Sequence, residues 1–355
     1  MSRFFSKKYS GLEPYVPGEQ PSDMSRYIKL NTNESPFPPS PKALAYAAQN
    51  TRPQNLYSDP ESALLTKALA DTYGVKPRMV LATNGSDEIL NFAFMAFCDE
   101  DNPALFADIT YGFYPVFAGL NAVPYELIPL REDFSLCVDD YFGKKGTVFI
   151  ANPNAPTGMP LPVSEIRRLL EADRNRIVVV DEAYVDFGTE SSVGLVKEFD
   201  NLLVCQTFSK SRSFAGGRLG YGIACEALIA DLNTIKYSTN PYNVNSMTSA
   251  LGIGILTDGE YTRANCRTIM ENREFTVRGL EALGFRVLPS GANFIFASSD
   301  RIEGGEYYRS LKDRGILVRH FDKERISNWC RITIGTKESM QALLDTTRTL
   351  LEEKR

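Results

Sequence analysis

The chain has 355 residues, with 39 Lys and Arg against 44 Asp and Glu, so its formal net charge is −5. This acidic balance argues against a face for nucleic acid or for an anionic membrane, and no apolar run approaches the roughly 18–20 residues that span a bilayer. Hydrophobic content of 43% and charged content of 23% are typical of a globular protein, and the length predicts one large and one small domain.

Thiols and imidazole limit the possible chemistry. The six cysteines are scattered without a C-x-x-C pair, and His320 is the only histidine. We therefore expect reduced, mostly buried thiols in a cytoplasmic protein rather than disulfides or a zinc site. A Ser-His-Asp triad or a His-rich metal centre would rest on this single histidine, so we expect neither. Residues 1–25 lack a long apolar core, so we expect no signal peptide.

The first 98 residues predict an arm, two helices and a strand–turn–helix unit. Residues 9–41 are rich in Pro, Gly, Ser and Asn, which is typical of an extended arm, and helices are expected over 42–50 and 61–73. Residues 79–98 combine an apolar strand, the turn Thr-Asn-Gly-Ser-Asp and an apolar-rich helix. The free amides at such a helix start, with the Ser86 hydroxyl, favour a phosphate. Ordinary helix capping is the alternative.

Three further strands end in aromatic or polar segments. Residues 105–117 contain a strand followed by an aromatic cluster, and residues 147–162 contain a strand and a polar turn, followed by an expected helix over 163–173. In residues 177–187, the strand 177–181 ends in the carboxylate of Asp181. The last of these strands is apolar throughout, which fits a parallel sheet covered on both faces. A carboxylate at its end lies where open α/β sheets bind ligands. A Walker-type metal site is the alternative, but the chain contains no G-x-x-x-x-G-K-[ST].

The stretch TFSKSRSFAGGRLGY, residues 207–221, follows the apolar run 202–205. It places one lysine, Lys210, at the end of a buried strand among hydroxyls and glycines. An amine there suits attack on a carbonyl, because burial and a nearby cation such as Arg218 both disfavour the charged form. The hydroxyls and the guanidinium suit a phosphate monoester. A strand, a turn and surface lysines are the alternative.

The rest of the chain predicts helices and short β/α units. Short strands are expected within 285–297, over 315–321 and within 329–336. Helices are expected over 226–237, 243–257, 262–284, 304–314 and 337–353. These elements divide the chain into an N-terminal arm over 1–41, a large domain over 42–248 and a small C-terminal domain over 249–355.

Together these motifs resemble a known family. The spacing of Lys210 and Arg218 is similar to that of the Schiff-base segment in fold-type I pyridoxal-phosphate (PLP) aminotransferases, and LNTNESPF, IVVVDEAYVDF and CRITIG resemble signatures of the histidinol-phosphate aminotransferase family. The resemblance runs from about Tyr15 to Arg331 in the family's order. It implies an α/β fold, with a large PLP-binding domain whose mostly parallel mixed sheet is sandwiched by helices, a small α/β C-terminal domain and an extended N-terminal arm.

The resemblance implies roles for residues around the cofactor. Lys210 forms the Schiff base and moves a proton as general base and acid, Asp181 keeps the pyridine nitrogen protonated, and Tyr184 reaches the cofactor's O3′. It also implies that Tyr111 stacks on the cofactor ring and that the turn residue Gly85 binds the cofactor, with Ser86, Ser209 and Arg218 on its phosphate. Tyr57 would reach that phosphate from the second subunit of a homodimer with shared active sites.

The resemblance also implies a substrate site. Arg331 binds the substrate carboxylate near Asn293, and Arg319 helps to hold the substrate's far phosphate. Tyr15 and Asn33, both in the N-terminal arm, are further candidates for binding the substrate.

At one position the chain departs from the family pattern. An asparagine precedes Pro156 in the wider superfamily and hydrogen-bonds O3′, whereas this chain has Ala155. The O3′ contact is then left to Asn154, to Asn152 or to Tyr184 alone.

We expect a PLP-dependent transaminase that acts on small molecules, a phosphorylated amine or amino acid and a 2-oxo acid. By resemblance the pair is histidinol phosphate and 2-oxoglutarate, in histidine biosynthesis. An aromatic amino-acid aminotransferase and a threonine-phosphate decarboxylase remain open on the same scaffold. A non-catalytic PLP-fold binding or regulatory protein is a further alternative, against which stands the complete set Asp181, Lys210, Arg218 and Arg331.

Overall fold

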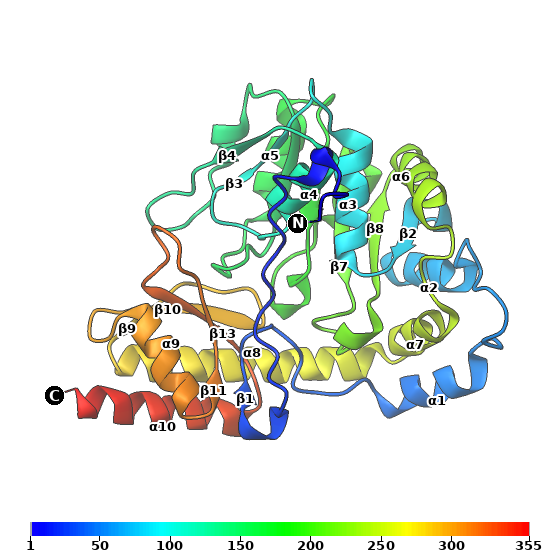
Figure 1. Ribbon diagram of the computed structural model, residues 1–355. Coiled ribbons are helices and arrows are strands. Elements are labelled where there is room, and N and C mark those ends of the chain that lie inside the picture. The colour runs from blue at the N-terminus through cyan, green and yellow to red at the C-terminus, as the bar shows by residue number, and fades with distance from the viewer. Residues whose placement is uncertain (1, 355) are drawn as a thin grey trace.

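The computed structural model describes residues 2–354 and is built around one seven-stranded sheet (Figure 1). The strand order is β2-β8-β7-β6-β5-β3-β4, and neighbours are parallel except where β8 is one of the pair. The strands are β2 (Val80–Thr83), β3 (Ala104–Ala107), β4 (Tyr125–Ile128), β5 (Thr147–Ala151), β6 (Val178–Asp181), β7 (Leu202–Thr207) and β8 (Gly220–Ala224). The mostly parallel sheet expected from the sequence is confirmed.

Helices cover both faces of this sheet. Alternate residues of a strand point to opposite faces, so neighbouring residues of one strand pack in different clusters. Val178 and Val180 belong to one hydrophobic cluster and Val179 to another. The first cluster includes residues of α2 (Ala63–Tyr73), α5 (Val163–Ala172) and α7 (Ser246–Thr257), and the second includes residues of α3 (Ser86–Phe97), α4 (Tyr114–Asn121) and α6 (Glu226–Thr239). Burial on both faces explains why the central strands are apolar throughout.

A smaller antiparallel sheet lies in the C-terminal part, with the order β12-β13-β10-β9. Its strands are β9 (Phe285–Val287), β10 (Phe294–Ser299), β12 (Arg319–His320) and β13 (Trp329–Thr333), and α8 (Gly259–Ala282), α9 (Gly304–Asp313) and α10 (Lys337–Glu353) share its hydrophobic cluster. The helix expected over 337–353 has the predicted bounds, whereas α8 begins and ends a few residues before the predicted 262–284. Across residues 2–354, no helix is both long and apolar enough to span a membrane.

The N-terminal arm joins these two parts. In Figure 1 it passes from beside α4 down to β1 (Ile28–Lys29), and α1 (Pro41–Asn50) follows it. Strand β1 pairs in parallel with β11 (Ile316–Leu317), while the next strand, β12, pairs with β13. One continuous strand was expected over 315–321, and it is divided because its two halves have different partners.

The parallel strands of the large sheet end together at one edge. Ala151 of β5 lies opposite Asp181 of β6, which lies opposite Cys205 of β7. The segments that follow these strands, together with the arm, therefore lie around the carboxyl edge of the sheet, where open α/β sheets bind ligands.

Candidate active site

A cavity of about 380 Å³ opens at this carboxyl edge. Many residues predicted for the site lie around it, although they come from segments far apart in the sequence. The predicted residues that line it are Tyr15, Asn33, Ser86, Tyr111, Asp181, Tyr184, Ser209, Lys210, Arg218, Arg319 and Arg331. Four predicted residues are not among the lining residues, namely Gly85, Asn154, Asn293 and Tyr57.

Lys210 follows the end of β7 and extends into the cavity. Its Nζ donates a hydrogen bond to the backbone carbonyl of Thr32 at 3.3 Å and lies 5.7 Å from the centre of the Tyr184 ring. Within residues 2–354, no other lysine lines this cavity. A carbonyl compound that enters the cavity therefore meets a single primary amine, held between the arm and an aromatic ring.

Asp181 ends β6 and is only 5% exposed. Its carboxylate accepts hydrogen bonds from the Tyr114 hydroxyl at 3.3 Å and the Ala183 amide at 3.2 Å. Burial, with the nearby charge of Asp87, raises the pKa of Asp181 to about 7. Within residues 2–354 this carboxylate has no ion-pair partner, and a buried carboxylate of this kind fits a cationic ligand group, such as a protonated pyridine nitrogen.

The turn before α3 forms a tight cradle. Gly85 has a φ of +80°, and a Cβ placed on it would lie 2.8 Å from the Arg218 Nη2 atom. A Cβ on Gly220, which begins β8, would lie 2.3 Å from the Ser86 backbone nitrogen. Arg218 donates to Asp87 at 3.2 Å and to the Ser209 hydroxyl at 3.5 Å. Free amides at the start of α3, two hydroxyls and a guanidinium thus converge, which fits a phosphate.

Tyr111 forms another wall of the cavity. Its hydroxyl donates to Asp87 at 2.7 Å, and its ring meets that of Tyr114 edge to face, 5.7 Å apart between centroids. Burial raises the pKa of Tyr111 well above its ordinary value, so this hydroxyl stays protonated. A ring fixed at both its edge and its hydroxyl offers a flat apolar face for a planar ligand.

Two arginines lie across the cavity from the large sheet. Arg331 of β13 donates to the Asn31 carbonyl at 2.9 Å, and its buried Nε atom has no hydrogen-bond partner in the described part of the chain. Burial lowers the pKa of this guanidinium. Arg319 of β12 donates to the carbonyls of Val16 and Pro17, at 2.9 and 3.1 Å. An unpartnered buried N–H on a cation is costly, so Arg331 fits an anionic ligand.

The arm supplies a partner for Tyr184. The Asn33 side-chain amide donates to the Tyr184 hydroxyl at 3.0 Å, and its own oxygen accepts from Thr333 at 3.0 Å. The backbone carbonyl of Asn33 accepts from the fully buried Asn293 at 2.9 Å. Because Asn33 occupies a lone pair of the Tyr184 hydroxyl, the hydroxyl hydrogen is free to donate into the cavity.

The two asparagines considered for the O3′ contact have their amides engaged elsewhere. Asn154 binds Thr110, Thr157 and the carbonyl of Ile109. The Asn152 amide forms a reciprocal pair with the backbone of Leu161. Ala155 itself lines the cavity. Of the three alternatives that the sequence leaves open, this arrangement favours Tyr184 alone.

Tyr57 lies apart from the cavity of its own chain. Its side chain is 77% exposed and stacks on Tyr242, with 4.5 Å between ring centroids. A large aromatic residue with this exposure is available for contact with another molecule.

Sequence reasoning missed three residues that shape the site. Asp87 joins Arg218 to Tyr111, Tyr114 donates to Asp181, and Gly220 allows β8 to approach the cradle. Asp87 looks like an ordinary acidic residue in a first helical turn, and Tyr114 like one more aromatic residue of its cluster. Gly220 carried a usable signal, because a glycine inside a buried strand often marks a close backbone approach.

Comparison with known proteins agrees with this site. The family model for class I and II aminotransferases matches residues 25–346. A histidinol-phosphate aminotransferase from Marinomonas sp. is 47% identical over 354 residues, which cover 99% of this chain and 100% of that protein. One from Pseudomonas putida is 46% identical over 346 residues, with 97% and 99% covered.

Solved structures show the same fold. A putative histidinol-phosphate aminotransferase from Erwinia carotovora has a TM-score of 0.86 at 25% identity, covering 96% of this chain and 99% of that one. A histidinol-phosphate aminotransferase from Sinorhizobium meliloti, solved in complex with pyridoxal-5′-phosphate, has a TM-score of 0.87 at 22% identity, with 99% of each chain covered. This chain therefore belongs to the histidinol-phosphate aminotransferase family of class I and II aminotransferases, which are PLP-dependent transaminases.

Proposed function

We propose that this enzyme transfers an amino group between histidinol phosphate and 2-oxoglutarate. The observation that carries the proposal is the joint position of Lys210, Asp181 and Arg331 around one cavity, with Arg319 beside them. The names of full-length relatives at 46% and 47% identity support the choice of substrate. All six cysteines are free thiols, which supports work in the reducing cytoplasm.

The residues of the cavity fit PLP. The buried Asp181 carboxylate would hold the pyridine nitrogen, the Tyr184 hydroxyl would donate to O3′, and the Tyr111 ring would cover one face. The cradle of Gly85, Ser86, Ser209 and Arg218 would hold the phosphate. PLP when bound supplies a reactive carbonyl carbon and an electron sink.

The amine of Lys210 performs the proton transfer. As general base and acid, this amine would take a proton from the substrate Cα and hold it for return to the reacting groups. The Thr32 carbonyl, within hydrogen-bond range of Nζ, orients the amine toward the cavity. Asp181 and Tyr111 are largely withdrawn from solvent, and electrostatic interactions are stronger in such surroundings than in water.

The anionic groups of both substrates are assigned to the two arginines. Arg331, whose buried Nε lacks a partner, would bind the carboxylate of the 2-oxo acid. Arg319 would help to hold the phosphate of histidinol phosphate. It now donates to two carbonyls of the arm, so phosphate binding would exchange neutral acceptors for a charged one. Tyr15 lines this end of the cavity, and Asn33 and Asn293 support it from the arm side and β10.

A panel of amino donors tests the substrate assignment. The PLP-loaded enzyme would be given 2-oxoglutarate with histidinol phosphate, phenylalanine or tyrosine, and glutamate formation would be measured. We expect histidinol phosphate to give the highest kcat/KM by at least tenfold. Equal or higher values for the aromatic amino acids would reassign the enzyme as an aromatic aminotransferase. Release of CO₂ from threonine phosphate would reassign it as a decarboxylase.

Arg331→Lys should lower kcat/KM for 2-oxoglutarate about 10- to 100-fold, because hydrogen bonds to charged groups contribute roughly 1.5–3 kcal/mol and lysine lacks the planar fork. The visible absorbance of the bound cofactor should not change, since Arg331 is assigned to the substrate. Arg314→Lys, at a half-exposed arginine that pairs with Glu353, is the matched control. Loss of cofactor absorbance in the Arg331 variant would move this arginine into the cofactor site.

We further propose a homodimer in which Tyr57 of one subunit completes the phosphate site of the other. Its exposure and its distance from its own cavity support this arrangement. Lys210→Ala retains Tyr57 but lacks the amine, and Tyr57→Phe retains the amine but lacks the hydroxyl. In a mixed dimer, one of the two sites has both wild-type groups and the other has neither.

Mixing and re-equilibrating these two variants should therefore restore wild-type cofactor affinity at one site per dimer. The lost hydrogen bond to a charged group corresponds to roughly 1.5–3 kcal/mol, about a 10- to 100-fold change in the Kd for PLP. The Kd would be measured by cofactor absorbance, with heterodimers verified by mass spectrometry. If heterodimers form and no site recovers its affinity, Tyr57 acts within its own chain.

A further inference from the structure

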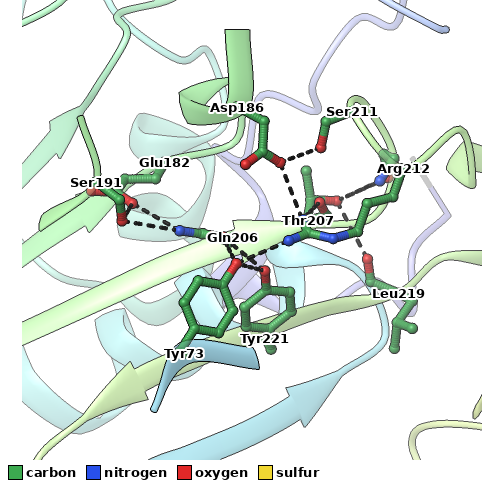
Figure 2. A network of polar contacts seen from close by, with 11 residues as sticks. Tyr73, Glu182, Asp186, Ser191, Gln206, Thr207, Ser211, Arg212, Leu219 and Tyr221 are labelled. Carbon is green, nitrogen blue, oxygen red and sulfur yellow. Dashed lines mark hydrogen bonds and ion pairs between the residues drawn. The ribbon is translucent and has the colours of Figure 1, made fainter. Parts of the chain in front are cut away.

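A largely buried polar network lies beside the cavity without lining it (Figure 2). It joins the segment after β6, strand β7, the turn after Lys210, β8 and α2. Its centre is Gln206, which is 2% exposed and comes just before the last residue of β7. We call it the Gln206 network. Its members are Tyr73, Glu182, Asp186, Ser191, Gln206, Ser211, Arg212 and Tyr221.

One half of the network holds the residue that follows Asp181. The Gln206 amide donates to Glu182 at 2.8 Å, and its oxygen accepts from the hydroxyls of Tyr73 and Tyr221, at 2.5 and 2.7 Å. Glu182 also accepts from the Ser191 hydroxyl at 2.6 Å. Every polar atom of the Gln206 side chain is thus engaged, which fixes its orientation.

The other half holds the residues that follow Lys210. Arg212, 9% exposed, donates to the Tyr73 hydroxyl at 2.9 Å and makes longer contacts, both 3.4 Å, with Asp186 and the Thr207 carbonyl. The Ser211 hydroxyl donates to the same carboxylate oxygen of Asp186. Figure 2 shows Asp186, Ser211 and Arg212 turned toward one another.

Each of the site residues Asp181, Tyr184 and Lys210 has a network member within two positions of it in the chain. Glu182 follows Asp181, Asp186 lies two residues after Tyr184, and Ser211 and Arg212 follow Lys210. We propose that the Gln206 network fixes the segment after β6 and the turn after β7 relative to each other, with Arg212 as the positioning residue. It would thereby set where the amine of Lys210 lies relative to Asp181 and Tyr184. This inference rests on the proposed roles of those three residues.

The composition of the network suits a role in positioning chain segments better than a role in stabilising the fold. It contains the buried carboxylate of Glu182 and the buried guanidinium of Arg212, while Asp186 is more exposed. Burying charged groups is a poor way to gain stability because of their desolvation cost. The contact between Arg212 and Asp186 is single and 3.4 Å long, so it is no close bidentate pair. Misplacing a reacting group by about 1 Å is costly for a catalysed step, so a rigid link between these segments has a functional use.

Arg212→Met and Asp186→Asn test the proposal, and the second keeps it testable if the first fails to fold. Arg176→Met is the matched control, since Arg176 is equally buried but precedes β6, at the end opposite Asp181, where it donates to the Tyr141 carbonyl. Hydrogen–deuterium exchange of the cofactor-free protein would be followed in peptides over 182–187 and 207–214. The PLP-loaded protein would be titrated to find the pH at which its visible absorbance changes, because the position of Lys210 relative to Asp181 sets the charges around its nitrogen.

We expect the exchange rate to rise at least tenfold in both segments for Arg212→Met, and to a smaller extent for Asp186→Asn. The pH midpoint of the absorbance change should also shift, and kcat should fall by a larger factor than KM changes. Arg212→Lys should restore part of each effect. Arg176→Met should change neither segment nor the midpoint. Faster exchange confined to residues beside the substituted one, with an unchanged midpoint, would overturn the proposal. A wild-type protein without visible cofactor absorbance would instead contradict the proposed function, leaving the exchange test intact.

Discussion

Lys210→Ala should remove the visible absorbance that PLP gives when covalently bound and should lower transamination at least ~10³-fold. General acid–base catalysis alone contributes typically 10²–10⁴-fold, and the covalent attachment is lost as well. The expectation follows from the cavity, in which Lys210 is the only lysine among the lining residues of the described chain. The measurements are an absorbance spectrum and the rate of glutamate formation.

A buried lysine elsewhere supplies the control. Lys236 of α6 is 2% exposed and donates to the Pro60 carbonyl, far from the cavity lining, so Lys236→Ala should keep the absorbance. Borohydride reduction of the wild-type enzyme followed by peptide mapping identifies the attached residue directly. A pyridoxyl label on any lysine other than Lys210 would reject the assignment.

Asp181→Asn should have opposite effects on catalysis and stability. Turnover should fall ~10²–10³-fold, as for the loss of one preorganised electrostatic partner of the transition state. The cofactor-free variant should nevertheless be more stable than the wild type at pH 8. The carboxylate of Asp181 is favourable only when a cationic ligand group lies beside it, and in the free protein its burial disfavours the ionised form.

The sign follows from proton linkage. The pKa of Asp181 is raised from 3.8 to about 7 on folding, so the folded protein binds the proton more tightly than the unfolded chain. The stability contribution of this group is therefore highest below pH 3.8, falls between pH 3.8 and about 7, and stays low above that. A rise of about 3 units corresponds to about 4 kcal/mol lost at pH 8. Asparagine has no proton to lose, so the variant lacks this pH dependence.

Urea denaturation of the cofactor-free proteins at pH 5 and pH 8 measures this effect. The gap in midpoint between Asp181→Asn and the wild type should be large at pH 8 and smaller at pH 5. Asp71→Asn, at an exposed carboxylate of α2, should show no such gap. A wild type that is as stable as the Asp181 variant at pH 8 would contradict the raised pKa.

Much of the site could be predicted because its reactive residues lie at the ends of apolar strands. Lys210 and Asp181 each come after a short apolar run, and the register of parallel strands brings such ends together. The helices of the fold were predictable for a similar reason, since 163–173 and 337–353 have clear apolar periodicity and correspond closely to α5 and α10.

The remaining features depend on contacts that no local pattern encodes. Gln206 is a polar residue inside an apolar strand, and nothing in its neighbours indicates that Glu182, Tyr73 and Tyr221 will surround it. Asn33 reaches Tyr184 across 151 positions of the chain. Such pairings are set by the topology of the whole fold, so a sequence window cannot reveal them.

The pairing of the arm with the C-terminal region determines when the enzyme becomes complete during synthesis. Asn33 binds the Thr333 hydroxyl 300 positions later, and β1 finds its partner only at Ile316. A ribosome-bound chain can form the large sheet while β11 and β13, which carry the partners of the arm, are still untranslated, since domains generally fold as units from the N-terminus. Residues 28–33 are therefore made long before their partners, and a chain that ends before β11 would have Lys210 and the arm but not the strands on which the arm docks.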